Sequence, residues 1–239
     1  MNILRFNSES DWTTAVTDFW QKRLRAKPDL RICLPSGHTP LPLFAELGRR
    51  VKAGQVSLRA AEIFALDDYG GLPADDPGRC VNMLRQHLLD HVDLPPDRFH
   101  GLDTTRSDLD RVCADYAAAI GPAGFDLTLL GIGLNGHLGL NEPGSAPDST
   151  VRRTTMHPAS VASSAKYLTH GGLPTWGVTV GLKELLASRE VWLLATGGSK
   201  AQILDRVCHG PITPDVPASL LRNHPNCLLL VDAAAGAKI

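Results

Sequence analysis

A histidine and a glutamate lie five residues apart in one glycine-rich segment of this chain. The segment runs from residue 130 to residue 144 and contains Asn135, His137 and Glu142. An imidazole gains and loses a proton near neutral pH, and a neighbouring carboxylate can orient or polarise it. The amide of Asn135 can position the imidazole or a substrate hydroxyl. These residue types at this spacing predict proton-transfer chemistry, although a lone histidine in a loop is more often structural.

The segment follows an apolar run at residues 126–130 that is typical of a buried parallel strand. Ligand sites of open α/β sheets lie beyond the carboxyl ends of such strands, so the segment is a candidate active site. Residues 131–136 also match the GxGxxG spacing of dinucleotide-binding sites. A helix follows directly in those sites, whereas Asn141, Pro143 and Pro147 break helices here. We therefore discount a nucleotide site.

Two adjacent carboxylates, Asp67 and Asp68, follow a second apolar run at residues 62–66. Such a pair can supply a general base whose pKa is tuned by its neighbour. Taken alone, a solvated acidic turn is the more common explanation. The predicted position on the same sheet edge as His137 favours a catalytic role for Asp67.

A third apolar run, at residues 31–34, ends in a short polar turn before a predicted helix start near Leu41. The turn consists of Ser36, Gly37, His38 and Thr39. Backbone N–H groups at a helix start bind anions, and the two hydroxyls add donors. The GxxxxGK[ST] spacing of triphosphate-binding loops is absent, so a single phosphate group fits better. An ordinary capping turn is the alternative.

Lys200 follows a glycine turn at residues 196–199 and lies in the first turn of another predicted helix. A cation is unfavourable at that end of the helix dipole, and a bound phosphate would offset this. A solvated surface lysine explains the feature equally well.

These candidate residues require elements that bring them together. The pattern predicts strands at residues 31–34, 62–66, 126–130, 178–180, 191–195 and 227–231. It predicts helices at residues 10–26, 41–51, 79–90, 107–120, 182–187 and 199–209, with a long Ser/Thr/Pro-rich loop at 142–160. We therefore expect an α/β fold: a three-layer, mostly parallel Rossmann-like sheet with helices on both faces. We expect residues 1–239 to form a single domain.

The composition excludes several classes of function. The chain has 24 basic and 25 acidic side chains and a formal net charge of -1, so we expect neither a nucleic-acid nor a membrane partner. Its five cysteines lack CxxC spacing, which argues against a zinc site or a disulfide framework. The N-terminal sequence lacks a signal-peptide apolar region, and we expect a cytoplasmic protein with reduced thiols and no bound metal.

Taken together, the segments resemble the glucosamine-6-phosphate deaminase (isomerase) family, whose fold also includes the 6-phosphogluconolactonases. The matching segments are LPSGHTP at residues 34–40, LDDY at 66–69, GLNGHLGLNEPG at 133–144, VTVGL at 178–182 and GSKA at 198–201. The resemblance covers almost the whole chain, from about residue 31 to residue 231. The Asn-Glu-Pro-Gly ending of the histidine segment is its most specific part.

The resemblance implies a hexosamine-6-phosphate deaminase, which couples aldose–ketose isomerisation to release of ammonia. His137 with Glu142 would open the sugar ring, and Asp67 would move the C2 proton to C1. The phosphate would bind Ser36, Gly37, His38 and Thr39, with Lys200 as a cation. No cofactor is implied, and the expected partner is a small aminosugar phosphate.

This sequence departs from the family pattern at several positions. Asn135 stands where an aspartate is common, and it can fix a tautomer but cannot supply a charge. Lys166 stands where a phosphate-binding arginine is expected. The basic residues and C-terminal extension of the allosterically activated hexamers are largely missing, so we expect either a monomer or a homo-oligomer. Residues 76–80 and 216–221 look more like the galactosamine-6-phosphate branch, which leaves the sugar epimer open.

Two other functions compete with deamination. A 6-phosphogluconolactonase-type hydrolase would use the same phosphate site and His137, but it needs no carbon base at Asp67. A non-catalytic sugar-phosphate-binding regulator would ordinarily carry a DNA-binding segment or a basic face, and the sequence shows neither.

Overall fold

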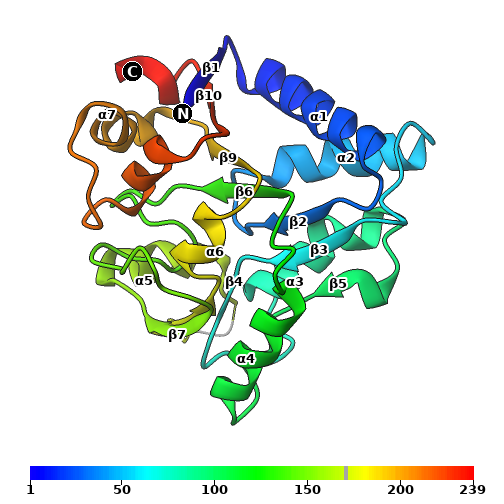
Figure 1. The fold of residues 1–239 in the computed structure, drawn as a ribbon, viewed down its shortest axis with the longest axis vertical. Helices are drawn as coiled ribbons and strands as arrows, with labels where there is room; N and C mark the ends of the chain where they lie inside the picture. Colours follow the sequence, from blue (N-terminus) through cyan, green and yellow to red (C-terminus); the bar gives the residue numbers. More distant parts are fainter. Residues whose placement is uncertain (170–171) are drawn as a thin grey trace.

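The computed structural model describes residues 1–169 and 172–239, and strands and helices alternate along much of the chain (Figure 1). The strands are β1 (Asn2–Phe6), β2 (Arg31–Leu34), β3 (Glu62–Ala65), β4 (Asp67–Tyr69), β5 (Phe99–His100), β6 (Leu127–Gly131), β7 (Arg152–Thr155), β8 (Trp176–Thr179), β9 (Glu190–Ala195) and β10 (Cys227–Asp232). The α-helices are α1 (Glu9–Ala26), α2 (Leu41–Lys52), α3 (Cys80–His87), α4 (Leu109–Ile120), α5 (Pro158–Ser164), α6 (Leu182–Leu186) and α7 (Ala201–His209).

Seven strands form the central sheet in the order β1-β10-β9-β6-β2-β3-β5, and all neighbouring strands are parallel. The carboxyl ends of parallel strands meet at one edge of a sheet. The segments that follow β2, β3, β6 and β9 therefore leave from the same edge. These are the four segments in which the sequence places its candidate functional residues.

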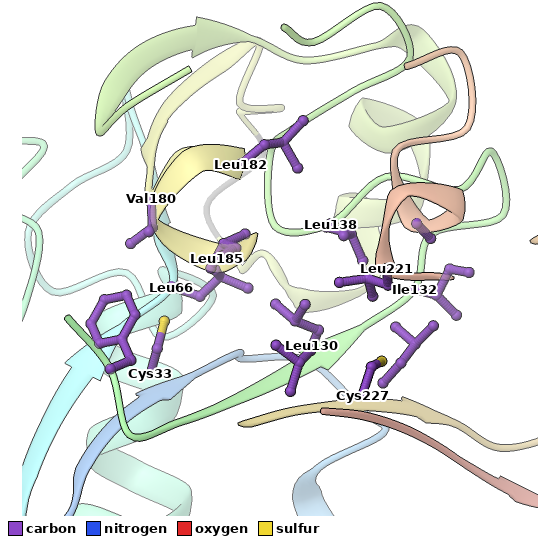
Figure 2. Close-up of a cluster of buried hydrophobic side chains, with 14 of the residues drawn as sticks. Cys33, Leu66, Leu130, Ile132, Leu138, Val180, Leu182, Leu185, Leu221 and Cys227 are labelled. Carbon is purple, nitrogen blue, oxygen red and sulfur yellow. The ribbon is translucent and has the colours of Figure 1, made fainter. Parts of the chain in front are cut away.

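Successive side chains of each strand point to opposite sides of the sheet. Because the side chains on both sides are apolar, helices cover both faces. On β2, Ile32 and Leu34 pack with the buried side chains of α1, α2 and α3. Cys33 points the other way, into the cluster to which buried residues of α4, α6 and α7 also belong. Figure 2 shows part of this cluster, including Leu185 of α6. Burial on both faces explains why the parallel strands read as continuous apolar runs. The predicted α/β class with three layers is confirmed.

Helix α1 illustrates how local sequence and packing agree. Ser8 caps it by accepting a hydrogen bond from the backbone N–H of Asp11 at 3.1 Å. Trp12 is fully buried and donates its indole N–H to the carbonyl oxygen of Leu230 on β10 at 3.0 Å. The helix has 18 residues, close to the predicted range.

Among the described helices, none combines the length and the apolar character needed to cross a bilayer.

A second, three-stranded sheet in the order β4-β8-β7 is antiparallel, and the sequence did not indicate it. Residues 178–180 were expected in the parallel sheet, but β8 lies in this small sheet instead. Residues 142–160 were expected to be a loop, but they contain β7 and the start of α5. The four residues of β7 (Arg-Arg-Thr-Thr) are polar and half-buried to exposed, so they carry no apolar periodicity that predicts a strand.

The small sheet fixes the position of Asp67 and depends on the absence of a side chain at Gly177. A Cβ at Gly177 would lie 2.5 Å from the carbonyl oxygen of Asp68 and 2.5 Å from Leu140. We expect Gly177→Ala to separate β4 from β8 and to lower the free energy of unfolding by about 1–3 kcal/mol, as overpacking does.

Chemical denaturation measures this effect, and Gly172→Ala is the matched control. Gly172 precedes the same strand, and a Cβ there would meet nothing within 4 Å. Equal stability of the two variants would contradict the proposed close contact.

Candidate active site at the carboxyl edge of the central sheet

The imidazole of His137 lies directly over the backbone of the loop that follows β6. A Cβ at Gly133 would fall 2.2 Å from the imidazole ring, so this position must be glycine. Gly136 adopts a φ of 89°, which turns the chain sharply just before the histidine. The glycines that marked this loop in the sequence thus place the histidine rather than a dinucleotide.

Asn135, His137 and Glu142 are in mutual contact. The Nδ1 atom of His137 lies 3.3 Å from a carboxylate oxygen of Glu142. Asn135 donates its amide to the same carboxylate at 2.9 Å and accepts from the backbone N–H of His137 at 3.2 Å. Asn135 therefore fixes both the histidine backbone and the glutamate. Glu142 orients the ring through Nδ1, which leaves Nε2 for a substrate.

Ser160 on α5 is a further member of this cluster that sequence reasoning missed. Its hydroxyl lies 3.1 Å from Nδ1 of His137 and also hydrogen-bonds Glu142. The backbone N–H of His157, the N-cap of α5, donates to Glu142 at 3.2 Å. Ser160 is 23 positions from His137 in a segment expected to be a loop, so no local pattern could have assigned it.

The environment of Glu142 keeps its carboxylate ionised. Burial alone would raise its pKa, but hydrogen bonds from His137, Ser160 and Asn135 and the charge of His137 outweigh burial and lower the pKa to about 2.

Within residues 1–169 and 172–239 the structure has no group of three or more His, Cys, Asp or Glu side chains placed to hold a metal ion.

Asp67 is a buried carboxylate whose raised pKa suits a general base. It lies at the start of β4 and is 8% exposed. Burial raises its pKa to about 7, the negative charge of Asp68 adds to this, and a hydrogen bond with Cys80 and the charge of His137 oppose it. A base with a pKa near the working pH transfers protons most effectively. The neighbouring Asp68 is instead held in an ion pair with Arg79.

The turn between β2 and α2 brings Ser36, Gly37, His38 and Thr39 to the same edge, just before the first turn of α2 at Leu41. Gly37 has a φ of 97°, which an L side chain rarely adopts.

Tyr167, which the sequence did not single out, covers this turn. Its ring lies 4.9 Å from the ring of His38, and its hydroxyl oxygen is 3.3 Å from where a Cβ on Gly37 would stand. Tyr167 belongs to the 3-10 turn Ala165–Tyr167, directly after α5. The segment that supplies Ser160 to the histidine therefore also supplies an aromatic cover to the polar turn.

Positive charge gathers beside the polar turn. Lys200 donates to the carbonyl oxygen of Ile132 at 2.6 Å and so joins the segments after β9 and β6. Burial, and then the positive charge of Lys166, lower the pKa of Lys200. Burial, Lys166 and His87 likewise lower the pKa of His38. Cations that repel one another at close range form a site that an anion would stabilise.

We expect Glu142→Gln to destabilise the protein most at neutral pH. A carboxyl group whose pKa falls from 4.5 to about 2 on folding adds stability above pH 4.5, and that stability is lost as the pH falls toward 2. At pH 7 the variant should lose about 2 kcal/mol, and the difference should shrink at pH 3.

Urea unfolding at the two pH values measures this difference. Asp97→Asn, which changes an exposed carboxyl group, is the control. A loss that is the same at pH 7 and pH 3 would contradict the ionised, hydrogen-bonded state of Glu142.

The sequence is similar to known proteins over nearly its full length. Residues 8–229 match the family described as glucosamine-6-phosphate isomerases/6-phosphogluconolactonase. The glucosamine-6-phosphate deaminase of Bacillus pumilus (strain SAFR-032) is 33% identical over 239 residues, which cover 99% of each chain. The glucosamine-6-phosphate deaminase of Pseudarthrobacter chlorophenolicus is 38% identical over 224 residues, covering 93% of this chain and 86% of that one.

Solved structures agree with the sequence comparison. A monomeric glucosamine-6-phosphate deaminase aligns over 100% of both chains with a TM-score of 0.95 and 28% identity. The 6-phosphogluconolactonase from Trypanosoma brucei is 24% identical and aligns over 100% of this chain and 98% of that chain. The TM-score of 0.80 shows that the two proteins share a fold. With a family match that spans most of the sequence and a fold shared throughout, this chain belongs to the glucosamine-6-phosphate isomerase/6-phosphogluconolactonase family.

Proposed function

We propose that this protein is an aminosugar-6-phosphate deaminase that converts glucosamine 6-phosphate to fructose 6-phosphate and ammonia. The observation that carries the proposal is Asp67, a buried carboxylate with a pKa of about 7 at the sheet edge where His137 also lies. A carboxylate whose pKa lies near the working pH is well suited to take a proton from carbon. Relatives named glucosamine-6-phosphate deaminase support the same function.

In the first step, the closed sugar ring opens. His137 is suited to move the proton between the ring oxygen and the C1 hydroxyl. Its Nδ1 atom is engaged by Glu142 and Ser160, so Nε2 is the nitrogen that faces a substrate. Glu142, ionised over the working pH range, would stabilise the imidazolium that forms when the histidine accepts a proton.

In the second step, the open-chain aldehyde isomerises. The ionised Asp67 removes the proton from C2 and the C1 oxygen takes up a proton, which gives an enolamine. The proton on Asp67 then returns to C1 while the amino nitrogen gives up one of its protons, which balances the proton gained by the oxygen. The product is an imine at C2. Water adds to that imine and the C–N bond breaks, which gives a ketose phosphate and one ammonia. Each proton taken by Asp67 is given back, so the base is regenerated at the end of the cycle.

The phosphate group of the substrate fits the polar turn at Ser36, Gly37, His38 and Thr39. Lys200 and Lys166 would supply the positive charge. A bound dianion would relieve the mutual repulsion of these cations, and backbone N–H groups at the start of α2 would add donors. We propose that the whole chain acts as one sugar-phosphate domain. The cytoplasmic location and the choice between monomer and homo-oligomer stay predictions.

A 6-phosphogluconolactonase activity is the second candidate, because proteins with that name share the fold. A lactonase activates water for attack on a carbonyl and has no need of a carbon base. The raised pKa of Asp67 is what favours deamination. Residues 76–80 and 216–221 leave the sugar epimer open, so galactosamine 6-phosphate, which differs only at C4, is tested alongside glucosamine 6-phosphate.

We expect purified protein to release ammonia from glucosamine 6-phosphate or galactosamine 6-phosphate, and Asp67→Asn to lower kcat by about 10²–10⁴-fold, the contribution of a positioned base. Ammonia release and ketose-phosphate formation are measured in parallel. Asp75→Asn, an exposed change in the following loop, is the control. Hydrolysis of 6-phosphogluconolactone that survives Asp67→Asn, with no aminosugar turnover, would instead establish the lactonase.

The pH dependence follows from the raised pKa of Asp67. Only the ionised carboxylate accepts a proton, so kcat/KM should fall about tenfold per pH unit below a pKa of about 7. Binding of sorbitol 6-phosphate over the same range separates titration of the phosphate from titration of the base. A kcat/KM that stays flat down to pH 5 would rule out a base with this pKa.

We expect Lys200→Ala and Lys166→Ala each to raise KM about tenfold while kcat changes less, because both cations act on the phosphate rather than on the reacting carbons. Steady-state kinetics with the preferred aminosugar phosphate measures kcat and KM separately. Lys22→Ala, an exposed lysine on α1, is the control. A fall in kcat with unchanged KM would assign the lysines another role.

A further inference from the structure

The side chain of Tyr167 lies against the polar turn between β2 and α2. Its ring centroid is 4.9 Å from that of His38, and the two ring planes meet at 39°. Its hydroxyl oxygen lies 3.3 Å from the position that a Cβ on Gly37 would take. The ring therefore covers His38, and the hydroxyl reaches the turn at its glycine.

The backbone around Tyr167 is attached to the site at two further points. A Cβ at Gly78, just before α3, would overlap the carbonyl oxygen of Tyr167, so the two segments pack closely because that position is glycine. Ser160, on the helix that directly precedes the Ala165–Tyr167 turn, lies 3.1 Å from Nδ1 of His137. These contacts restrict where the phenol can lie.

The hydroxyl of Tyr167 is a donor without a protein acceptor. Among the residues that the structure describes, none accepts a hydrogen bond from it, and the side chain is half-buried. Tyr116 shows the contrast, because its hydroxyl donates to the carbonyl oxygen of Ala65 at 2.6 Å. The hydroxyl of a buried tyrosine usually finds a partner, so the unpaired hydroxyl of Tyr167 is available to a ligand at the turn.

The backbone donors of the same turn are also unpaired. Over the described part of the chain, the N–H groups of Gly37, His38 and Thr39 reach no protein acceptor. The next N–H along the chain, that of Leu41, donates to the carbonyl oxygen of His38 at 3.2 Å. A phosphate group consists of acceptor oxygens, and it would satisfy the N–H groups and the phenol together.

The residue before Tyr167 supplies the charge that a phenol lacks. Nζ of Lys166 lies 4.9 Å from the centroid of the Tyr167 ring. A lysine ammonium acts on a phosphate as a point charge, whereas a planar guanidinium can bind two oxygens at once. A neutral donor beside the lysine adds the directed hydrogen bond that the ammonium does not fix. Lys166 and Tyr167 thus offer charge and direction from adjacent positions.

We propose that Tyr167 is a phosphate-binding residue: its hydroxyl donates a hydrogen bond to an oxygen of the phosphate held by the turn at residues 36–39, with Lys166 beside it. This inference rests on the proposed function of that turn as the phosphate site. It gives Tyr167 no contact with the reacting carbons, so the residue contributes to binding and not to proton transfer.

Tyr167→Phe tests the inference, because it removes the hydroxyl and keeps the ring against His38 and Lys166. Calorimetric titration with inorganic phosphate and with sorbitol 6-phosphate measures binding without turnover. We expect both Kd values to rise about tenfold, the lower end of what a hydrogen bond to a charged group contributes. KM for the preferred aminosugar phosphate should rise by a similar factor, while kcat changes less than threefold.

Tyr116→Phe is the matched control. It also removes one phenol hydroxyl, but that hydroxyl is paired with the carbonyl oxygen of Ala65 inside the protein. The change should lower the thermal unfolding temperature and leave both Kd values as they are in the unmodified protein. Thermal unfolding of both variants checks that they are folded.

NMR of the unmodified protein gives a readout that does not depend on the stability of Tyr167→Phe. The chain has three tyrosines, so labelling the phenol Cζ with carbon-13 gives three signals. Tyr116→Phe and Tyr69→Phe assign two of them, and the third belongs to Tyr167. Added inorganic phosphate should shift the signal of Tyr167 and leave that of Tyr116 in place.

Unchanged Kd values in Tyr167→Phe, or equal weakening in Tyr116→Phe, would overturn the inference. Tighter binding in Tyr167→Phe would also overturn it, because the phenol would then obstruct the turn. If the unmodified protein binds neither inorganic phosphate nor sorbitol 6-phosphate, the phosphate site and this role of Tyr167 are both wrong. Absence of aminosugar turnover alone defeats the deaminase function, and the phosphate titrations still decide whether Tyr167 binds phosphate.

Discussion

The buried carboxylate of Asp67 is the constraint on which the rest of the proposed site depends. Removing a carboxylate from water disfavours its charged form, and the protein would lower that cost most simply by placing a cation against it. The buried guanidinium of Arg79 binds the neighbouring Asp68 instead. Asp67 therefore keeps a pKa of about 7, a value useful for moving a proton from carbon at neutral pH.

The parallel sheet explains how residues far apart in the sequence meet around this carboxylate. Because β2, β3, β6 and β9 run in the same direction, their carboxyl ends open at one edge. Lys200 joins two of the resulting segments through its hydrogen bond to Ile132. Large apolar cores on both faces keep the strands in register, and Figure 2 shows part of one of them. The polar edge is thus supported by strands that are packed on both faces.

The segment from β7 to the turn at Tyr167 contributes two side chains to the site that do not come from the loops after the parallel strands. It places Ser160 against His137 and Glu142, and Tyr167 against His38. One short stretch thereby contacts both the proposed proton-transfer residues and the proposed phosphate turn. The small antiparallel sheet connects this stretch to β4, because β8 pairs with β7 on one side and with β4 on the other. A shift of that sheet would move Asp67 and Ser160 together.

The sequence by itself determined the α/β class, most strands of the central sheet and the contact of His137 with Glu142. Long apolar runs identify buried strands. Residues five positions apart on one glycine-rich loop need only a local turn to come into contact. Tertiary structure alone decided the antiparallel β4-β8-β7 sheet and the partners of each carboxylate. Those contacts join polar residues far apart in the chain, and such pairs leave no periodicity in the sequence. Arg79 could pair with either Asp67 or Asp68, depending on which face of β4 packs against α3. Tertiary packing decides that face, and the local sequence does not.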